Sequence, residues 1–226
     1  MWALCANATN LRRNCSTGFA RPNIGPTTSA PSQRIRLAES NPFRTEVFCS
    51  LIGLIAYMVG TMVLIRLAKV AMIASLAAYA FIVAYDNIID YQSNYEFVRH
   101  VLSMDTTFPG NALMHRAITN ENVWRIAYVW IIATEASTAL LLVVGALVLL
   151  GRLGAPAAAF NRSKVWAVAG LTVGFGLWFF GFMVIAGEYF AMWQSKVWNG
   201  QDAAFRIATV ILGVLIFVSL PDSDRE

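Results

Sequence analysis

Four apolar runs separated by polar segments dominate the chain from Met62 onward. They lie at about Met62–Tyr85, Trp124–Leu150, Val165–Ile185 and Ala203–Leu220. Each is roughly 20 residues long, the length at which an α-helix crosses the hydrocarbon of a bilayer. The pattern predicts an all-α fold, a four-helix transmembrane bundle over residues 62–222 with a short tail at 223–226.

Composition supports a membrane protein and argues against nucleic acid as a partner. The chain is 58% hydrophobic and 13% charged, whereas soluble domains carry about 25% charged residues. Six arginines precede residue 47 against two glutamates, which leaves eleven basic and eleven acidic residues in the remainder. The membrane part therefore has no basic face for a nucleic acid, and its expected partner is the lipid bilayer.

Residues 1–46 lack hydrophobic periodicity, and the role of Val47–Thr61 stays open. We expect residues 1–61 to be a disordered or mis-annotated extension, with Met58 or Met62 as the initiator instead of Met1. A natural basic cytoplasmic tail and a transit peptide are the alternatives. All three cysteines fall here, so the bundle has neither a disulfide nor a thiolate metal site: Cys5, Cys15 and Cys49.

Charge in the loops predicts the orientation. Arg152, Arg162 and Lys164 lie between the second and third runs without any acid, which is typical of a cytoplasmic loop. Both termini are then cytoplasmic, and loops 86–122 and 187–203 are external. Arg66 and Lys69 are expected to extend to the cytoplasmic interface. An aromatic belt is expected at the outer end of the second run, formed by Trp124, Tyr128 and Trp130.

The external loop 86–122 contains a short helical pattern. Phe97, Val101 and Met104 recur at helical spacing, and Ser103 or Asp105 is expected to cap or close the helix. Pro109 and Gly110 follow and are expected to end the helix. We predict an ordered loop with one short helix along the membrane surface.

Glu135 is the acidic residue nearest the middle of a predicted span. It lies about eleven residues into the second run, roughly 16 Å deep at 1.5 Å per residue. Charged groups at that depth are costly and usually functional. Two interpretations stay open: a neutral carboxyl that hydrogen-bonds another helix, or a group that handles a proton, ion or ligand. Thr134, Ser137 and Thr138 are expected to help satisfy it.

A second constellation follows the third run, in the segment GEYFAMWQSKVWNG at 187–200. Together with the loop at 86–110 it predicts an external polar cup. The cup is interpreted as a structural cap, a ligand or quinone-headgroup pocket, or a metal site using His100 with Asp86, Asp105 or Glu188. The candidate functional residues, Glu135 included, are Asp86, Asn87, Asp90, Asn94, His100, Asp105, Glu135, Glu188, Gln194, Trp198, Asn199 and Arg206.

Within this set we predict an ion pair between Glu188 and Arg206. No catalytic residue is assigned, because Ser103, His100 and Asp105 lack the surroundings of a nucleophile elbow. Haem is disfavoured because His100 and His115 lie in a loop instead of on facing helices. The cofactor stays unassigned.

Several segments in order resemble the domain of unknown function 2165 family of small bacterial integral membrane proteins. They are DNIIDYQSNYEFVRHVLSMDTTFPGN, RAI at 116–118, IIATE at 131–135 and GEYFAMWQSKVWNG. The resemblance covers about Met62 to Asp222. It implies a four-helix architecture, and it implies no particular activity because none is established for the family. His115 departs from the aromatic residue expected before RAI, which makes it a poor candidate for an essential ligand.

Three functions are compatible with these features. The favoured one is a non-enzymatic accessory or assembly module of the bacterial inner membrane, which associates with itself or a larger complex. It draws on a small-residue stripe suited to helix contacts, formed by Ala167, Gly170, Gly174 and Gly181. The alternatives are a small transporter or channel using Glu135, and a membrane enzyme with an external carboxylate and histidine pocket.

Overall fold

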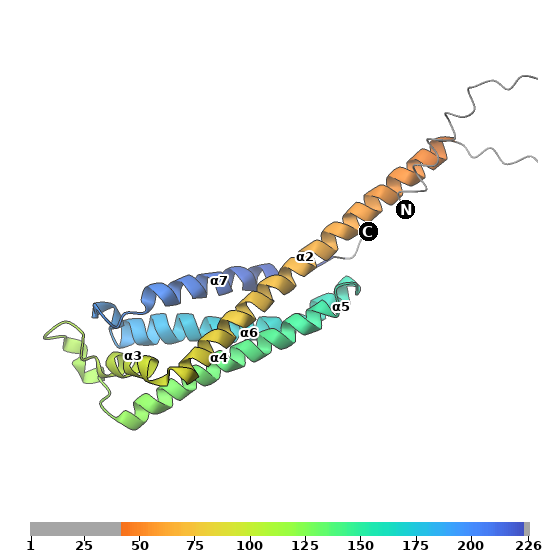
Figure 1. Ribbon diagram of the computed structural model, residues 1–226. Helices are drawn as coiled ribbons and strands as arrows, with labels where there is room; N and C mark the ends of the chain where they lie inside the picture. Colours follow the sequence, from red (N-terminus) through yellow and green to blue (C-terminus); the bar gives the residue numbers. More distant parts are fainter. Residues whose placement is uncertain (1–41, 224–226) are drawn as a thin grey trace, which may run out of the picture. The chain divides into compact units, whose positions relative to one another are not determined.

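The computed structural model describes the backbone of residues 42–223 and the side chains from Gly60 onward (Figure 1). The chain divides into two compact units, Met1–Gly60 and Thr61–Glu226, and the second contains the helical bundle. The elements in chain order are α2 (Pro42–Ile89), α3 (Tyr91–Ser103), η1 (Ala112–Arg116), α4 (Glu121–Leu150), α5 (Ala157–Arg162), α6 (Val165–Phe175), η2 (Gly176–Tyr189), η3 (Met192–Gln194) and α7 (Gln201–Ser219).

Among the residues whose side chains the structure describes, four helical stretches are long and apolar enough to cross a membrane. They are Gly60–Ile89, Glu121–Leu150, Ala157–Tyr189 and Gln201–Ser219. Each contains nearly all of one predicted run, so the all-α four-helix bundle is confirmed and the protein is a multi-pass integral membrane protein. The third span differs most, because α5 precedes α6 and the helix continues as a π-helical stretch, η2.

The bundle core is built from residues spaced three or four apart on each spanning helix, the spacing that places them on one face. On α2 these are Val70, Ile73, Ala77 and Ala80, and all four are buried. The other spans contribute the same kind of row, with many small residues, including Ala139, Leu142 and Ala146 on α4, Ala167 and Leu171 on α6, and Ala204, Ala208 and Ile211 on α7.

A close helix contact joins α4 and α6, which pack extensively against each other. A Cβ atom placed on Gly145 would lie 2.7 Å from the backbone nitrogen of Ala167. A Cβ on Gly170 would lie 2.9 Å from Leu142. The predicted small-residue stripe is therefore largely used within the chain. Gly181 is the exception, since its nearest neighbour would be Leu177 at 3.7 Å.

The predicted loop helix lies at the end of the bundle where α2 meets α3 (Figure 1). We call this end, with loops 86–122 and 187–203, the cap. Helix α3 buries Tyr95, Val98 and Val101. It ends at Met104, whose φ of 55° is left-handed. The expectation that Pro109 and Gly110 end the helix is wrong, because a left-handed residue reverses the chain five residues earlier. After the turn, Ile118 N–H donates to Leu102 O at 2.8 Å, which ties the loop back to α3.

Two further expectations need correction. Residues 42–61 are helical as part of α2, not disordered, because no proline interrupts the helix-forming stretch after Pro42. Residues 1–41 lie outside the described part of the chain, and the structure does not bear on which methionine is the initiator. Tyr128 belongs to no aromatic belt: it is 1% exposed and packs against Tyr91 and Tyr95. Trp130 is 69% exposed and does face outward.

Candidate functional site

Glu135 is held in the bundle interior by a residue from another helix. Its side chain is 2% exposed, and its Oε2 accepts a hydrogen bond of 2.7 Å from Asn87 Nδ2. Asn87 lies near the end of α2, and its backbone carbonyl accepts a 3.0 Å bond from the Tyr128 hydroxyl. The two bonds join α2 to α4 at this depth.

The hydroxyl residues near Glu135 do not satisfy it, contrary to expectation. Thr134 donates to Trp130 O, Ser137 to Ala133 O and Thr138 to Thr134 O, all within α4. Such bonds to the carbonyl four residues earlier are the easiest partners for a hydroxyl in a helix. Asn87 is therefore the partner of the carboxyl group that the structure identifies.

This pair lines a cavity of about 200 Å³. Tyr79, Trp178 and Ala204 form part of its wall, and Asn94 lines it from α3. Asn94 is exposed, which places an amide between the buried carboxyl and the cap surface. The cavity is the place in the described bundle where polar groups from α2, α3 and α4 converge.

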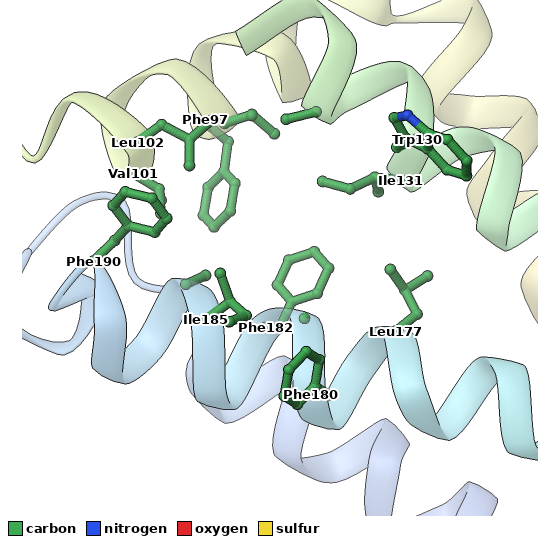
Figure 2. A pocket seen from close by; sticks show the side chains of 14 residues that line it. Phe97, Val101, Leu102, Trp130, Ile131, Leu177, Phe180, Phe182, Ile185 and Phe190 are labelled. Carbon is green, nitrogen blue, oxygen red and sulfur yellow. The ribbon is translucent and has the colours of Figure 1, made fainter. Parts of the chain in front are cut away.

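A larger cavity, which we call the apolar recess, adjoins it. The recess measures about 570 Å³. Figure 2 shows side chains of α3 and α4 facing those of η2 across it. Phe97, Val98, Ile131 and Phe182 line both cavities. The remaining lining residues are apolar or glycine: Val101, Leu102, Ala127, Trp130, Leu177, Phe180, Gly181, Ile185, Ala186 and Phe190.

His100 is fixed on the cap by contacts on three sides. Its Nδ1 lies 2.8 and 2.9 Å from the two carboxylate oxygens of Asp105, and its ring stacks on Trp198 at 4.6 Å. Arg99 Nη2 lies 2.7 Å from its Nε2. Because arginine can only donate, Nε2 accepts and Nδ1 carries the proton that goes to Asp105. These contacts hold the imidazole between Asp105 and Trp198.

The same network reaches Glu96. Arg99 Nε donates to Glu96 Oε2 at 2.6 Å, and that hydrogen bond lowers the pKa of the Glu96 carboxyl. Both side chains are about one-third exposed, so the pair orients groups on the cap surface and adds little stability.

The predicted polar cup assembles only in part. Gln194 Oε1 accepts bonds from Phe108 N and Asn111 Nδ2, and Asn199 Oδ1 accepts from Gln201 N at the start of α7. Three acids that were expected to converge are exposed instead: Asp86, Asp90 and Glu188. Among the described residues no group of three or more His, Cys, Asp or Glu is placed to hold a metal ion.

The predicted pair of Glu188 and Arg206 is wrong. Arg206 Nε donates to Asp202 O at 3.1 Å, one turn earlier on α7. The carbonyls of a first helical turn lie along the path of such a side chain, and this local bond replaces the longer-range ion pair. His115 is likewise engaged locally, with Nδ1 at 3.1 Å from Ala112 O.

A cluster at the opposite end of the bundle was not anticipated as a site. Lys69 and Lys164 approach the same carboxylate oxygen of Asp222, at 2.8 and 2.6 Å. Arg66 Nε lies 3.8 Å from the other oxygen. Asn161 receives a bond from Asp222 N and donates one to Asp222 O. We call these residues the tail-end cluster, because they clamp the segment that follows α7.

Ionisation of Asp222 is favoured in this setting. Burial raises its pKa, but hydrogen bonds from Lys164 and Lys69 outweigh burial, and the pKa lies below its ordinary value. The sequence signal for the cluster was an acid just after the last span, at the same end as Arg66, Lys69 and Lys164. Arg66 and Lys69, which were expected to extend toward the interface, are instead buried within the cluster.

Comparison with known families places the chain. The family described as "Predicted small integral membrane protein (DUF2165)" matches residues 65–221. The chain belongs to this family. The DUF2165 match contains the Asn87–Glu135 pair, the cap and the three cations of the tail-end cluster, and it stops one residue before Asp222. The chain matches no curated protein and no solved structure.

Proposed function

We propose that the protein is a non-enzymatic accessory module of a membrane complex, which receives a transmembrane helix of a partner in the apolar recess. In this proposal the membrane is the bacterial inner membrane, with both termini cytoplasmic and the cap outside. The acid-free basic loop at Arg152 to Lys164 supports this orientation. Labelling of a cysteine at the exposed Val197 by a membrane-impermeant reagent in intact cells tests it, in a background without the native cysteines.

The observation that carries the proposal is the shape and lining of the recess. Trp130 and Phe180, which are 69% and 59% exposed, flank a hollow of about 570 Å³. Ala127, Gly181 and Ala186 also line it. In lipid, helices associate by close packing at small residues, because burial away from water no longer drives association. Gly181 is open while Gly170 and Gly174 are packed against α4, so Gly181 remains available to a neighbouring helix.

The polar groups support a structural use of the chain's own chemistry. Glu135 is bonded to Asn87 across two helices, and His100 is enclosed by Asp105, Arg99 and Trp198. Each of these contacts orders the bundle or the cap. An accessory module needs such rigidity, because a partner binds most tightly to a surface that is already organised.

The test compares two glycine substitutions. Gly181→Leu fills the recess, whereas Gly213→Leu adds the same side chain at a position on α7 with no atom within 4 Å. We expect Gly181→Leu to lower the fraction recovered in a stable assembly from mild detergent by about tenfold, and Gly213→Leu to leave it unchanged. Cross-linking from Trp130, followed by mass spectrometry, identifies the neighbour.

A foreign protein cross-linked at fixed stoichiometry supports the proposal, and a second copy of this chain restricts it to self-assembly. Lipid as the neighbour, with equal assembly for both variants, contradicts it.

A second function is favoured by one observation: the cavity around Glu135, which Asn94 connects with the cap side. Such a cavity suits a transporter or channel that binds a proton at the carboxyl. In reconstituted vesicles, Glu135→Gln should then abolish proton flux while leaving the protein folded. Equal dye responses in wild-type, Glu135→Gln and protein-free vesicles would count against transport.

A further inference from the structure

The tail-end cluster carries more positive than negative charge among the described residues. Arg66, Lys69 and Lys164 converge on one carboxylate, that of Asp222. The other partners are uncharged: Arg66 donates to the carbonyls of Leu153 and Ala155, and both lysines donate to Leu220 O. Carbonyl dipoles satisfy hydrogen bonds without cancelling a net charge of two.

These cations are removed from water. The exposed fractions are 6% for Arg66, 2% for Lys69 and 5% for Lys164. Burying a charge costs several kcal/mol unless an opposite charge compensates it. One carboxylate compensates one of the three, so the site favours an additional anion.

One donor and one cavity indicate where that anion binds. Arg66 Nε is buried and has no hydrogen-bond acceptor. A cavity of about 260 Å³ is lined by Arg66, Lys69 and Asp222 on its polar side and by Met62, Ile65 and Phe217 on its apolar side. A ligand that fits both sides has an anionic head and a hydrocarbon chain.

We propose that this cavity binds the phosphate group of an anionic phospholipid, with the head at Arg66 and Lys69 and an acyl chain along Met62, Ile65 and Phe217. The site lies beside Met62 to Lys69 of α2 and at the end of the last span, which ends at Ser219. Lipid phosphates occupy the bilayer at this level. Arginine is suited to the task, since its planar donors match phosphate oxygens.

The direct test uses the whole wild-type protein in neutral detergent. Phosphatidylglycerol, phosphatidylcholine or inorganic phosphate is added, and the midpoint of thermal unfolding and the native mass spectrum are recorded. We expect phosphatidylglycerol to raise the midpoint by about 5 °C or more at a hundredfold excess over its dissociation constant. A single bound lipid should appear in the mass spectrum. The lipid assignment is overturned if phosphatidylcholine raises the midpoint as much as phosphatidylglycerol does. It is also overturned if inorganic phosphate, added without lipid, raises the midpoint.

A matched pair of variants locates the site. Arg66→Gln removes the donor in the cavity. Arg162→Gln removes one exposed charge at the end of α5, two residues before Lys164 of the cluster. The apparent affinity for phosphatidylglycerol, measured from the stabilisation, should fall at least tenfold for Arg66→Gln and stay unchanged for Arg162→Gln. Equal losses in both variants mean a diffuse attraction and overturn the proposal. If Arg66→Gln does not fold, the wild-type mass spectrum still decides whether one lipid binds.

The chain's own end offers a competing anion. Asp224 and Glu226 follow the cluster in sequence and lie outside the described residues. A chain ending at Ser223 distinguishes the two sources of charge. Equal stabilisation of the full and shortened chains by phosphatidylglycerol supports the lipid site. If phosphatidylglycerol stabilises only the shortened chain, the tail fills the cavity in the full chain, and the lipid proposal is overturned. That outcome would not affect the function proposed for the apolar recess.

Discussion

At the scale of single residues, Glu135 illustrates how a polar group can be used inside an apolar bundle. A carboxyl at mid-span needs a partner, because an unsatisfied polar group in a water-free interior costs roughly 1–3 kcal/mol. Asn87 supplies that partner from α2, and Tyr128 in turn bonds the Asn87 carbonyl. The side chain thus specifies which faces of α2 and α4 meet.

This pairing predicts a strongly non-additive pair of substitutions. Asn87→Leu should destabilise the bundle by roughly 1–3 kcal/mol, because it leaves Glu135 buried without its amide partner. Adding Glu135→Leu should recover much of that loss, since both polar groups are then replaced by apolar ones. Equilibrium unfolding in mixed micelles of increasing denaturing detergent measures the difference. Simple addition of the two single effects would contradict the coupling.

At the scale of elements, the positions of the spans could be predicted from the sequence better than the contacts between helices. Apolar length alone locates the second and fourth spans to within a few residues, whereas α2 begins at Pro42, well before the predicted start, and α5 precedes the predicted third span. The end of α3 depends on Met104 entering a left-handed conformation, for which methionine gives no sequence signal. Helix pairing depends on which glycines face a neighbour, and all glycines look alike in a sequence.

The contact of α4 with α6 predicts sharply different effects of one methyl group. Gly145→Ala places a Cβ 2.7 Å from Ala167 N and 2.8 Å from its Cα. These are backbone atoms, so the helices must separate, at a cost of roughly 1–3 kcal/mol. Gly176→Ala meets no atom within 4 Å and should be neutral or stabilising by up to about 1 kcal/mol. Thermal midpoints of the two purified variants provide the measurement, and a similar midpoint for both would contradict the close contact.

At the scale of the whole molecule, sequence patterns predicted some of the contacts between candidate residues and missed others. His100 and Asp105 could be associated because they are close in sequence, and they do meet. Glu188 and Arg206 could not be resolved, because a helical arginine has carbonyls of its own turn within reach. The tail-end cluster joins residues about 150 positions apart, such as Lys69 and Leu220. Only the folded bundle brings these ends together.

That cluster makes the stability of the bundle depend on pH in a defined window. The pKa of Asp222 is lower in the folded protein than the ordinary value of about 3.9. The charged carboxylate therefore stabilises the fold above pH 4, and this contribution is lost as the pH falls through the lower, folded-state pKa. Arg66 and Lys69 face this carboxylate from α2, and Lys164 faces it from the turn between α5 and α6.

Asp222→Asn should remove this contribution at all pH values. At pH 7 the variant leaves three buried cations without their carboxylate, and we expect a loss of roughly 3 kcal/mol. As the pH falls through the lowered folded-state pKa, the wild-type carboxyl becomes protonated, and the two proteins should approach the same stability. Unfolding midpoints recorded from pH 2 to pH 7 measure the gap, with Asp202→Asn on α7 as the control for a lost acid outside the cluster. A gap that stays constant over this range would mean that the Asp222 charge does not hold the ends of the bundle together.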